Sequence, residues 1–231
     1  DKPKLLVLPY PNNPTGAIMR REDLEAIAKV LKDTNIMIAS DEIYSELTYS
    51  GKHCSIAEIE GMRERTIVIN GFSKSFAMTG WRLGFLGGPK EIVSQMLKLH
   101  QYAIMSSPTV SQYAAIVAMH SCQKDIDAMR NEYNIRRRFV VDSFNKLGLK
   151  CFAPQGAFYV FPCIKSTGMT STDFCEKLVY TKKVAVVPGD AFGECGEGYV
   201  RVSYAYSLNH LREAIKRIGE FLEDIKNGNV Q

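Results

Sequence analysis

The feature that most constrains the fold of this sequence is the regular alternation of short apolar runs with amphipathic segments. The apolar runs lie at residues 5–8, 36–39, 66–69 and 83–88, and the segment 21–31 has its apolar residues at helical spacing. Short, continuously apolar strands separated by helices predict an α/β fold with a mostly parallel sheet covered on both faces.

The second half of the chain has a different pattern. Residues 90–148 are helical almost throughout, with an interruption at Ser107-Pro108 and a long amphipathic helix over 125–147 that ends at Gly148. Strands are then expected at 157–161, 184–187 and 199–203, and helices at 172–182 and 208–226. We therefore predict a first domain over 1–122, a long connecting helix over 123–148 and a smaller α/β domain over 149–231.

Composition excludes several classes of protein. The chain has 231 residues, 45% of them hydrophobic, which is enough for a packed core. Its net charge of +4 is too small, and its basic residues too scattered, to indicate a nucleic-acid partner. No apolar stretch reaches the roughly 18 residues of a membrane span, so no membrane partner is expected.

The cysteines and histidines do not indicate a metal site. The six cysteines are dispersed, no C-x-x-C occurs, and the four histidines never fall at helical ligand spacing. Dispersed cysteines without a secretory segment suit a reducing compartment, so the default expectation is a cytoplasmic protein.

Polar side chains follow each predicted strand. Since the carboxyl ends of parallel strands meet at one edge of a sheet, ligands bind there. The candidates at these positions are Asn13, Asp41, Tyr44, Ser73, Lys74 and Arg82.

Each candidate also has an ordinary structural interpretation. Asn13 could close a turn between prolines, Asp41 could cap a short helix, and Lys74 could be an exposed surface lysine. Arg82 could stack on Trp81. Their joint occurrence at successive strand ends favours a site.

Together the six residues suit pyridoxal phosphate. Lys74 could form a Schiff base with the cofactor, and Asp41 could pair with the protonated pyridine nitrogen. The remaining positions would serve the phenolic oxygen (Tyr44 and Asn13) and the phosphate (Ser73 and Arg82).

Three motifs carry a resemblance to a known family. They are Pro-Asn-Asn-Pro-Thr-Gly at 11–16, Ser-Asp-Glu-Ile-Tyr at 40–44 and Ser-Lys-Ser-Phe-Ala-Met-Thr-Gly-Trp-Arg-Leu-Gly at 73–84. They resemble the signatures of class I/II pyridoxal-phosphate-dependent aminotransferases, which are aspartate aminotransferase-like enzymes of fold type I. Gly-Ala-Phe-Tyr at 156–159 and Val-Arg-Val-Ser at 200–203 extend the resemblance over nearly the whole chain.

The resemblance implies an activity and a set of site residues. It makes Lys74 the catalytic lysine of an enzyme that moves an amino group between an amino acid and a 2-oxo acid. It gives Asn13, Asp41, Tyr44, Ser73 and Arg82 the cofactor contacts named above. Arg201, with Asn13, would bind the α-carboxylate of the substrate.

The resemblance also has consequences for the organisation of the protein. Relatives are homodimers that begin before Asp1, so residues 1–122 would be the C-terminal part of the cofactor domain, without its N-terminal part. The chain departs from many relatives at Gly71, where they have a serine that binds the phosphate. Gly189 is interpreted as a turn residue.

Two alternatives remain open. The same fold and motifs serve carbon–sulfur β-lyases, and the chain could be an inactive fragment in the form given. A nicotinamide-dependent dehydrogenase is disfavoured because no G-x-G-x-x-G motif occurs.

Overall fold

The computed structural model describes residues 3–229, and these residues form two compact units. Unit 1 comprises 3–12, Ala17–Arg130 and Gln155–Ala157. Unit 2 comprises Asn13–Gly16, Asn131–Pro154 and 158–229. The boundary at Arg130 lies inside the long helix that the sequence predicts as a connector. The assignment of 1–122, 123–148 and 149–231 as separate domains stays a prediction.

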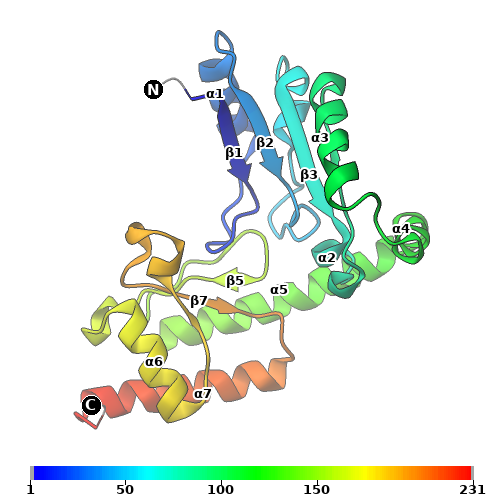
Figure 1. Cartoon of the computed structure of the whole chain (residues 1–231). Coiled ribbons are helices and arrows are strands. Elements are labelled where there is room, and N and C mark those ends of the chain that lie inside the picture. The colour runs from blue at the N-terminus through cyan, green and yellow to red at the C-terminus, as the bar shows by residue number, and fades with distance from the viewer. Residues whose placement is uncertain (1–2, 230–231) are drawn as a thin grey trace. The chain divides into compact units, whose positions relative to one another are not determined.

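Unit 1 is built on a four-stranded sheet (Figure 1). The strands are β1 (Leu5–Pro9), β2 (Met37–Asp41), β3 (Thr66–Gly71) and β4 (Gly84–Gly87), in that order across the sheet. The first three are parallel, with Leu5 opposite Met37 and Ile38 opposite Thr66, whereas β4 is antiparallel to β3. The predicted α/β class with a mostly parallel sheet is confirmed.

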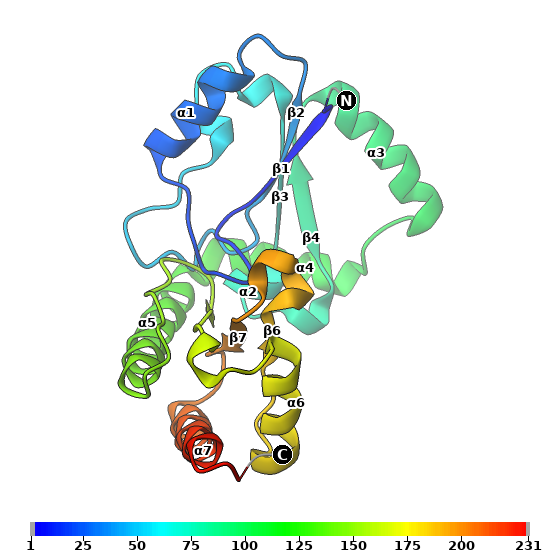
Figure 2. The ribbon, with the colours of Figure 1, turned by 90° about the vertical axis from the view of Figure 1, so that its left-hand side faces the viewer.

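One face of this sheet is closed by α1 (Arg21–Leu31), which begins and ends where its apolar spacing predicts. Figure 2 shows α1 and α3 (Lys90–Ala103) on opposite sides of the sheet. The core on the side of α1 consists of Leu8, Leu24, Ala28, Leu31, Ile38, Ile56, Ile59 and Met62.

The other face of the sheet is less covered than expected. The alternation of β1 leaves Leu5 and Val7 exposed by 52% and 57%, and α3 contributes no buried residue. Within the described residues, the expectation of a sheet covered on both faces therefore holds only for the side of α1.

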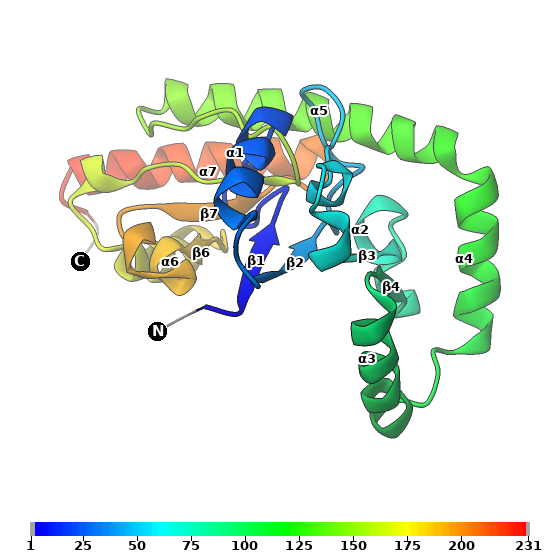
Figure 3. The same cartoon turned by 90° about the horizontal axis from the view of Figure 1, so that it is seen from above.

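The helical region after β4 divides into separate helices. Pro108 caps the start of α4 (Thr109–Ser121), and α5 (Gln123–Lys146) follows; Figure 3 shows α3 and α4 as distinct helices. The four-residue helix α2 (Phe72–Ser75) packs its Phe72 against Ala115 and Ala118 of α4.

Unit 2 has a smaller sheet and longer helices. Its strands β5 (Tyr159–Val160), β7 (Val200–Ser203) and β6 (Val187–Pro188) are antiparallel, with β7 in the centre. The helices are α6 (Ser171–Lys182) and α7 (Leu208–Lys226), and α7 runs alongside the unit 2 part of α5 in Figures 1 and 3.

The core of unit 2 lies between these helices and the sheet. Phe174 of α6 and Phe221 of α7 are almost fully buried and meet edge to face, with ring centroids 5.2 Å apart. Val140 and Phe144 of α5 are 1% exposed. Gly148 has a positive φ of 82°, which lets the chain turn after α5 as predicted.

Short 3-10 helices complete the secondary structure. They are η1 (Ile56–Glu58), η2 (Arg63–Arg65), η3 (Thr79–Trp81), η4 (Lys165–Thr167), η5 (Gly189–Phe192) and η6 (Glu194–Gly196). Between residues 3 and 229, no helix is both long and apolar enough to cross a membrane, and no cluster of potential metal ligands occurs.

Candidate active site

The carboxyl edge of the unit 1 sheet carries most of the predicted site residues. Asp41 is the last residue of β2, and α2, which contains Ser73 and Lys74, begins directly after β3. Asp41 pairs with Ile69 of β3, two residues before that strand ends. Because β2 and β3 are parallel neighbours, the carboxylate and the amine emerge at the same edge of the sheet.

The turn after Asp41 is closely hydrogen-bonded. The carboxylate of Asp41 accepts a bond from the backbone N–H of Ile43 at 3.2 Å, and the N–H of Glu42 donates to Ile69 at 2.8 Å. Tyr44 is only 5% exposed. The turn therefore fixes the backbone of two predicted cofactor ligands, Asp41 and Tyr44, relative to β3.

Glu42 is a buried carboxylate for which the sequence predicts no role. It accepts hydrogen bonds from the hydroxyls of Ser40 (2.9 Å) and Ser55 (2.5 Å), and its other oxygen lies 2.8 Å from Nε2 of His53. Burial opposes ionisation of Glu42, but the bonds from His53, Ser55 and Ser40 outweigh it, so its pKa is lowered. The local signal for this cluster in the sequence is Ser40-x-Glu42, whereas His53 and Ser55 come from a later segment.

The segment after Lys74 folds back on itself. The hydroxyl of Thr79 donates to the carbonyl of Ser73, and the guanidinium of Arg82 donates to the carbonyl of Thr79, each at 2.9 Å. Arg82 has a left-handed backbone, with φ 52°, at the C-terminal end of η3. This conformation is uncommon for a residue with a side chain, and such residues cluster at functional sites.

Gly71 is explained by the packing of β3 against β4. Gly71 lies opposite Gly84, and a Cβ at Gly71 would come within 3.1 Å of the Gly84 backbone and 3.2 Å of the Leu83 carbonyl. The absence of a side chain therefore permits the close approach of these two strands.

The residues of unit 1 fit pyridoxal phosphate by their chemistry. The set contains an amine at Lys74, a hydroxyl at Ser73 and a guanidinium at Arg82, which suit an aldehyde and a phosphate. The carboxylate of Asp41 and the phenol of Tyr44 suit a protonated ring nitrogen and a phenolic oxygen.

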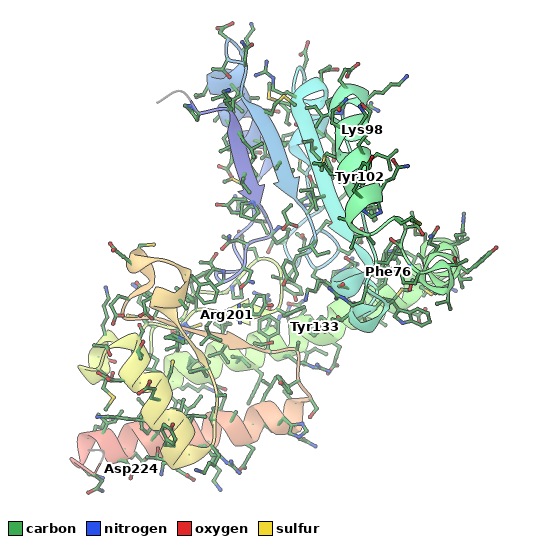
Figure 4. The ribbon with its side chains drawn as sticks, in the orientation of Figure 1. Phe76, Lys98, Tyr102, Tyr133, Arg201 and Asp224 are labelled. Carbon is green, nitrogen blue, oxygen red and sulfur yellow. The ribbon has the colours of Figure 1, made fainter. Side chains whose placement is uncertain are left out.

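Unit 2 holds the other two predicted residues, and they contact each other. Nη1 of Arg201 donates to Oδ1 of Asn13 at 2.8 Å, although the two residues are 188 positions apart in sequence. Arg201 lies on the central strand β7 and is labelled in Figure 4. The two residues predicted to share a substrate carboxylate are thus hydrogen-bonded within one unit.

The structure therefore places the predicted residues in two groups. Unit 1 carries Asp41, Tyr44, Ser73, Lys74 and Arg82, and unit 2 carries Asn13 and Arg201. The roles assigned to these residues remain predictions.

A mostly parallel sheet with a carboxylate, an amine and a guanidinium at its carboxyl edge is typical of α/β enzymes that bind an anionic cofactor. The chain belongs to the aminotransferase class I and II family, whose sequence profile matches residues 1–218. Enzymes of this family depend on pyridoxal phosphate.

Individual relatives show how far the similarity extends. The chain is 46% identical to an aspartate aminotransferase of Pyrococcus abyssi, over 98% of this chain and 59% of the relative. It is also 46% identical to aromatic-amino-acid aminotransferase 2 of Thermococcus litoralis, over 97% and 59% of the two chains.

A solved structure gives the same result for the fold. The crystal structure of an aromatic aminotransferase from Pyrococcus horikoshii superposes with a TM-score of 0.94 and 45% identity, covering 96% of this chain and 61% of that one. The chain spans about 59% of the length of the two curated relatives named above.

Proposed function

We propose that this chain carries the catalytic and ligand-binding residues of a pyridoxal-phosphate-dependent aminotransferase. Such an enzyme moves an amino group between an amino acid and a 2-oxo acid. The observation that supports this function most directly is that Asp41, the last residue of β2, and Lys74, in the helix directly after the neighbouring strand β3, lie at one edge of the parallel sheet.

The residues of unit 1 would hold the cofactor. Lys74 would attach to its aldehyde through the side-chain amine, and Asp41 would keep its ring nitrogen protonated. Tyr44 would bind the phenolic oxygen, together with Asn13 of unit 2. Ser73 and Arg82 would bind the phosphate, and Ser73 carries the hydroxyl contact because position 71 has no side chain.

Lys74 would also move the proton of the reaction. With an amino acid bound at the cofactor, the free amine of Lys74 would take the proton from Cα of the substrate as a general base. Pyridoxal phosphate supplies the electron sink that makes this proton acidic enough to remove. Protonated Lys74 would then act as a general acid and give this proton to the former aldehyde carbon of the cofactor instead of to Cα, so that hydrolysis would release a 2-oxo acid.

Arg201 and Asn13 would orient the substrate. A guanidinium can donate two parallel hydrogen bonds to a carboxylate, which fixes both the position and the plane of that group. The bond between Arg201 and Asn13 supports a shared role, because it places an amide beside the guanidinium.

The decisive experiment compares the chain with its Lys74→Ala variant. We expect the visible absorbance band of lysine-bound cofactor with the chain and not with the variant, and a loss of transamination by several orders of magnitude. Undiminished transamination by Lys74→Ala would contradict the role of this lysine. Release of pyruvate and ammonia from cysteine-type substrates, without a 2-oxo acid, would contradict an aminotransferase.

The same experiment tests whether the chain is inactive in the form given. If the 231-residue chain shows no cofactor band while a longer form of the same protein does, the site needs further polypeptide. A panel of amino acids is required in either case, because the relatives are named for both aspartate and aromatic substrates.

The surface of unit 1 supports a homodimeric enzyme. Side chains on α3 and α4 and in the turn between them are largely exposed although they are apolar: Leu97, Leu99, Tyr102 (labelled in Figure 4), Ile104, Met105, Val110, Tyr113, Ile116, Val117 and Met119. Apolar patches of this kind mark protein interfaces. A cytoplasmic location is also proposed, and the six unpaired cysteines support a reducing environment.

A further inference from the structure

The guanidinium of Arg201 contacts two aromatic rings. Its central carbon lies 4.6 Å from the ring centroid of Tyr159 and 4.8 Å from that of Phe192. Both distances fall within the range of about 6 Å in which a cation is attracted to the face of a ring. Neither aromatic residue is among the site residues predicted from the sequence.

Arg201 lacks the partner that usually holds a half-buried arginine. Among the described residues, no carboxylate lies within salt-bridge distance of Arg201, and its Nε is buried without a hydrogen-bond partner. A carboxylate partner would fix the side chain but would also neutralise it. Aromatic rings can fix it and leave its positive charge available for an anion.

Tyr159 is held rigidly by the small sheet. It is 8% exposed and lies on β5, where it pairs with Ser203 of the central strand, two residues from Arg201. Its ring also contacts that of Phe158, with centroids 4.8 Å apart. The ring face under Arg201 therefore has a fixed position.

Phe192 is positioned by a tightly packed loop. The loop returns on itself at Gly189 and Gly196, where a Cβ on Gly189 would lie 2.1 Å from the carbonyl oxygen of Gly196. The N–H of Gly189 also donates to the carbonyl of Tyr199 at 2.9 Å, which ties the loop to the start of β7. Phe161 supports the ring of Phe192 edge to face at 6.3 Å.

We propose that Tyr159 and Phe192 are positioning residues, which hold the guanidinium of Arg201 in one orientation without neutralising it, so that it can bind a substrate carboxylate. This inference rests on the proposed function for the identity of the anion. An arginine side chain has several rotatable bonds, and restricting them in advance lowers the entropic cost of each hydrogen bond to the ligand. Neither ring needs to touch the substrate.

The first test measures the orientation of Arg201 directly in the 231-residue chain. The Nε–Hε NMR signal of Arg201, identified by its loss in Arg201→Lys, should be shifted by the two rings. Phe192→Leu and Tyr159→Leu should move the signal toward the value of an unstacked arginine, whereas Phe192→Tyr and Tyr159→Phe should preserve it. An unchanged signal in both leucine variants would overturn the proposal.

The second test measures anion binding and turnover. In both leucine variants, we expect the dissociation constant of maleate and the KM of the amino acid to rise roughly threefold to tenfold, with kcat changed much less. Phe152→Leu, at an exposed phenylalanine of the same unit, controls for general destabilisation and should leave both constants unchanged. Equal KM values in the wild type and both leucine variants would overturn the proposal.

The two tests separate this inference from the proposed function. If no amino acid is transaminated but the NMR signal and maleate affinity change as described, the function fails and the positioning role stands. If the wild type is active and the leucine variants match it in KM and in the Arg201 signal, the function stands and the positioning role fails.

Discussion

The two units differ in how they use their apolar residues. Among the residues that the structure describes, 21 large apolar side chains are exposed, of which 17 belong to unit 1 and four to unit 2. Unit 1 packs one face of its sheet against α1 and leaves apolar side chains of the other face and of α3 and α4 exposed. Unit 2 buries Phe144, Phe174 and Phe221 between three helices and a small sheet. The core of unit 2 is thus closed by its own elements, whereas unit 1 presents a surface suited to an interface.

The largest loss of stability is expected for a substitution in the core of unit 2. Phe221→Ala removes a ring that is fully buried against Phe174, so the free energy of unfolding should fall by about 3–5 kcal/mol. Tyr180→Ala, at a residue of α6 that is 75% exposed, should change it by less than about 0.5 kcal/mol. Urea unfolding measures both. Similar losses in the two variants would mean that unit 2 is not closed as described.

A smaller loss of stability is expected where the backbone of Gly189 closely approaches that of Gly196. Gly189→Ala places a Cβ against backbone atoms that cannot rotate away, so it should cost about 1–3 kcal/mol. Gly80→Ala in unit 1 is the matched control, because a Cβ there has no neighbour within 4 Å. Thermal unfolding of both variants checks this, and equal midpoints would contradict the close approach.

The buried carboxylate of unit 1 should make stability depend on pH. The pKa of Glu42 is lowered in the folded state, so its contribution is complete above the ordinary carboxyl pKa of about 4.3 and is lost as the pH falls through the lower folded value. Glu42→Gln should cost about 1–3 kcal/mol at pH 7, and the difference from the wild type should shrink below about pH 4. Urea unfolding at several pH values measures this.

Glu213 provides the control for Glu42. Its pKa is also lowered, by a hydrogen bond from Arg217, but the residue lies on the exposed face of α7. Glu213→Gln should therefore leave the pH dependence of unfolding unchanged. An equal effect of the two substitutions would show that burial and the contacts from Ser40, His53 and Ser55 do not matter.

The smallest effect on stability is expected on the exposed surface of unit 1. Tyr113→Lys, at a residue of α4 that is 69% exposed, should change the free energy of unfolding by less than about 0.5 kcal/mol. If this surface is the interface of a homodimer, the same substitution should weaken self-association in sedimentation experiments. Tyr206→Lys in unit 2, at a similarly exposed tyrosine, should not.

The sequence predicts the elements of unit 1 well because their patterns are local. The apolar spacing of 21–31 gives both ends of α1. The apolar runs at 36–39 and 66–69 overlap the first residues of β2 and β3. No local pattern in the sequence shows that β4 runs antiparallel to β3, because strand direction is a property of the pairing between the two strands.

The strands of unit 2 are shorter than their apolar runs for a backbone reason. Ala157 and Lys183 have positive φ values of 57° and 58°, which interrupt the extended chain at or just before the predicted strands 157–161 and 184–187. Pairing with β7 extends over Tyr159–Val160 and Val187–Pro188, so the second of these strands begins only at the last residue of the predicted run 184–187. An apolar pattern shows burial but not these dihedral angles.

The part of the candidate site that lies in sequence motifs at the strand ends is predictable from the sequence. Asp41 and Lys74 follow strands directly, so their convergence follows from a parallel sheet. The contacts of Arg201 with Asn13, Tyr159 and Phe192 join segments that are distant in sequence, and only the fold reveals them. The role of Glu42 could not be predicted for the same reason, since its partners His53 and Ser55 come from a later loop.

The contact between Gly71 and Gly84 has a consequence for protein engineering. A serine introduced at position 71 to supply a further phosphate hydroxyl would bring its Cβ to 3.1 Å from the backbone of Gly84, so the two strands would have to separate by a few tenths of an ångström. Arg82 lies only two residues before Gly84, so a change in the spacing of these strands occurs close to a predicted phosphate ligand. At this edge of the sheet, a change in the number of anion-binding hydroxyls is therefore coupled to the spacing of β3 and β4.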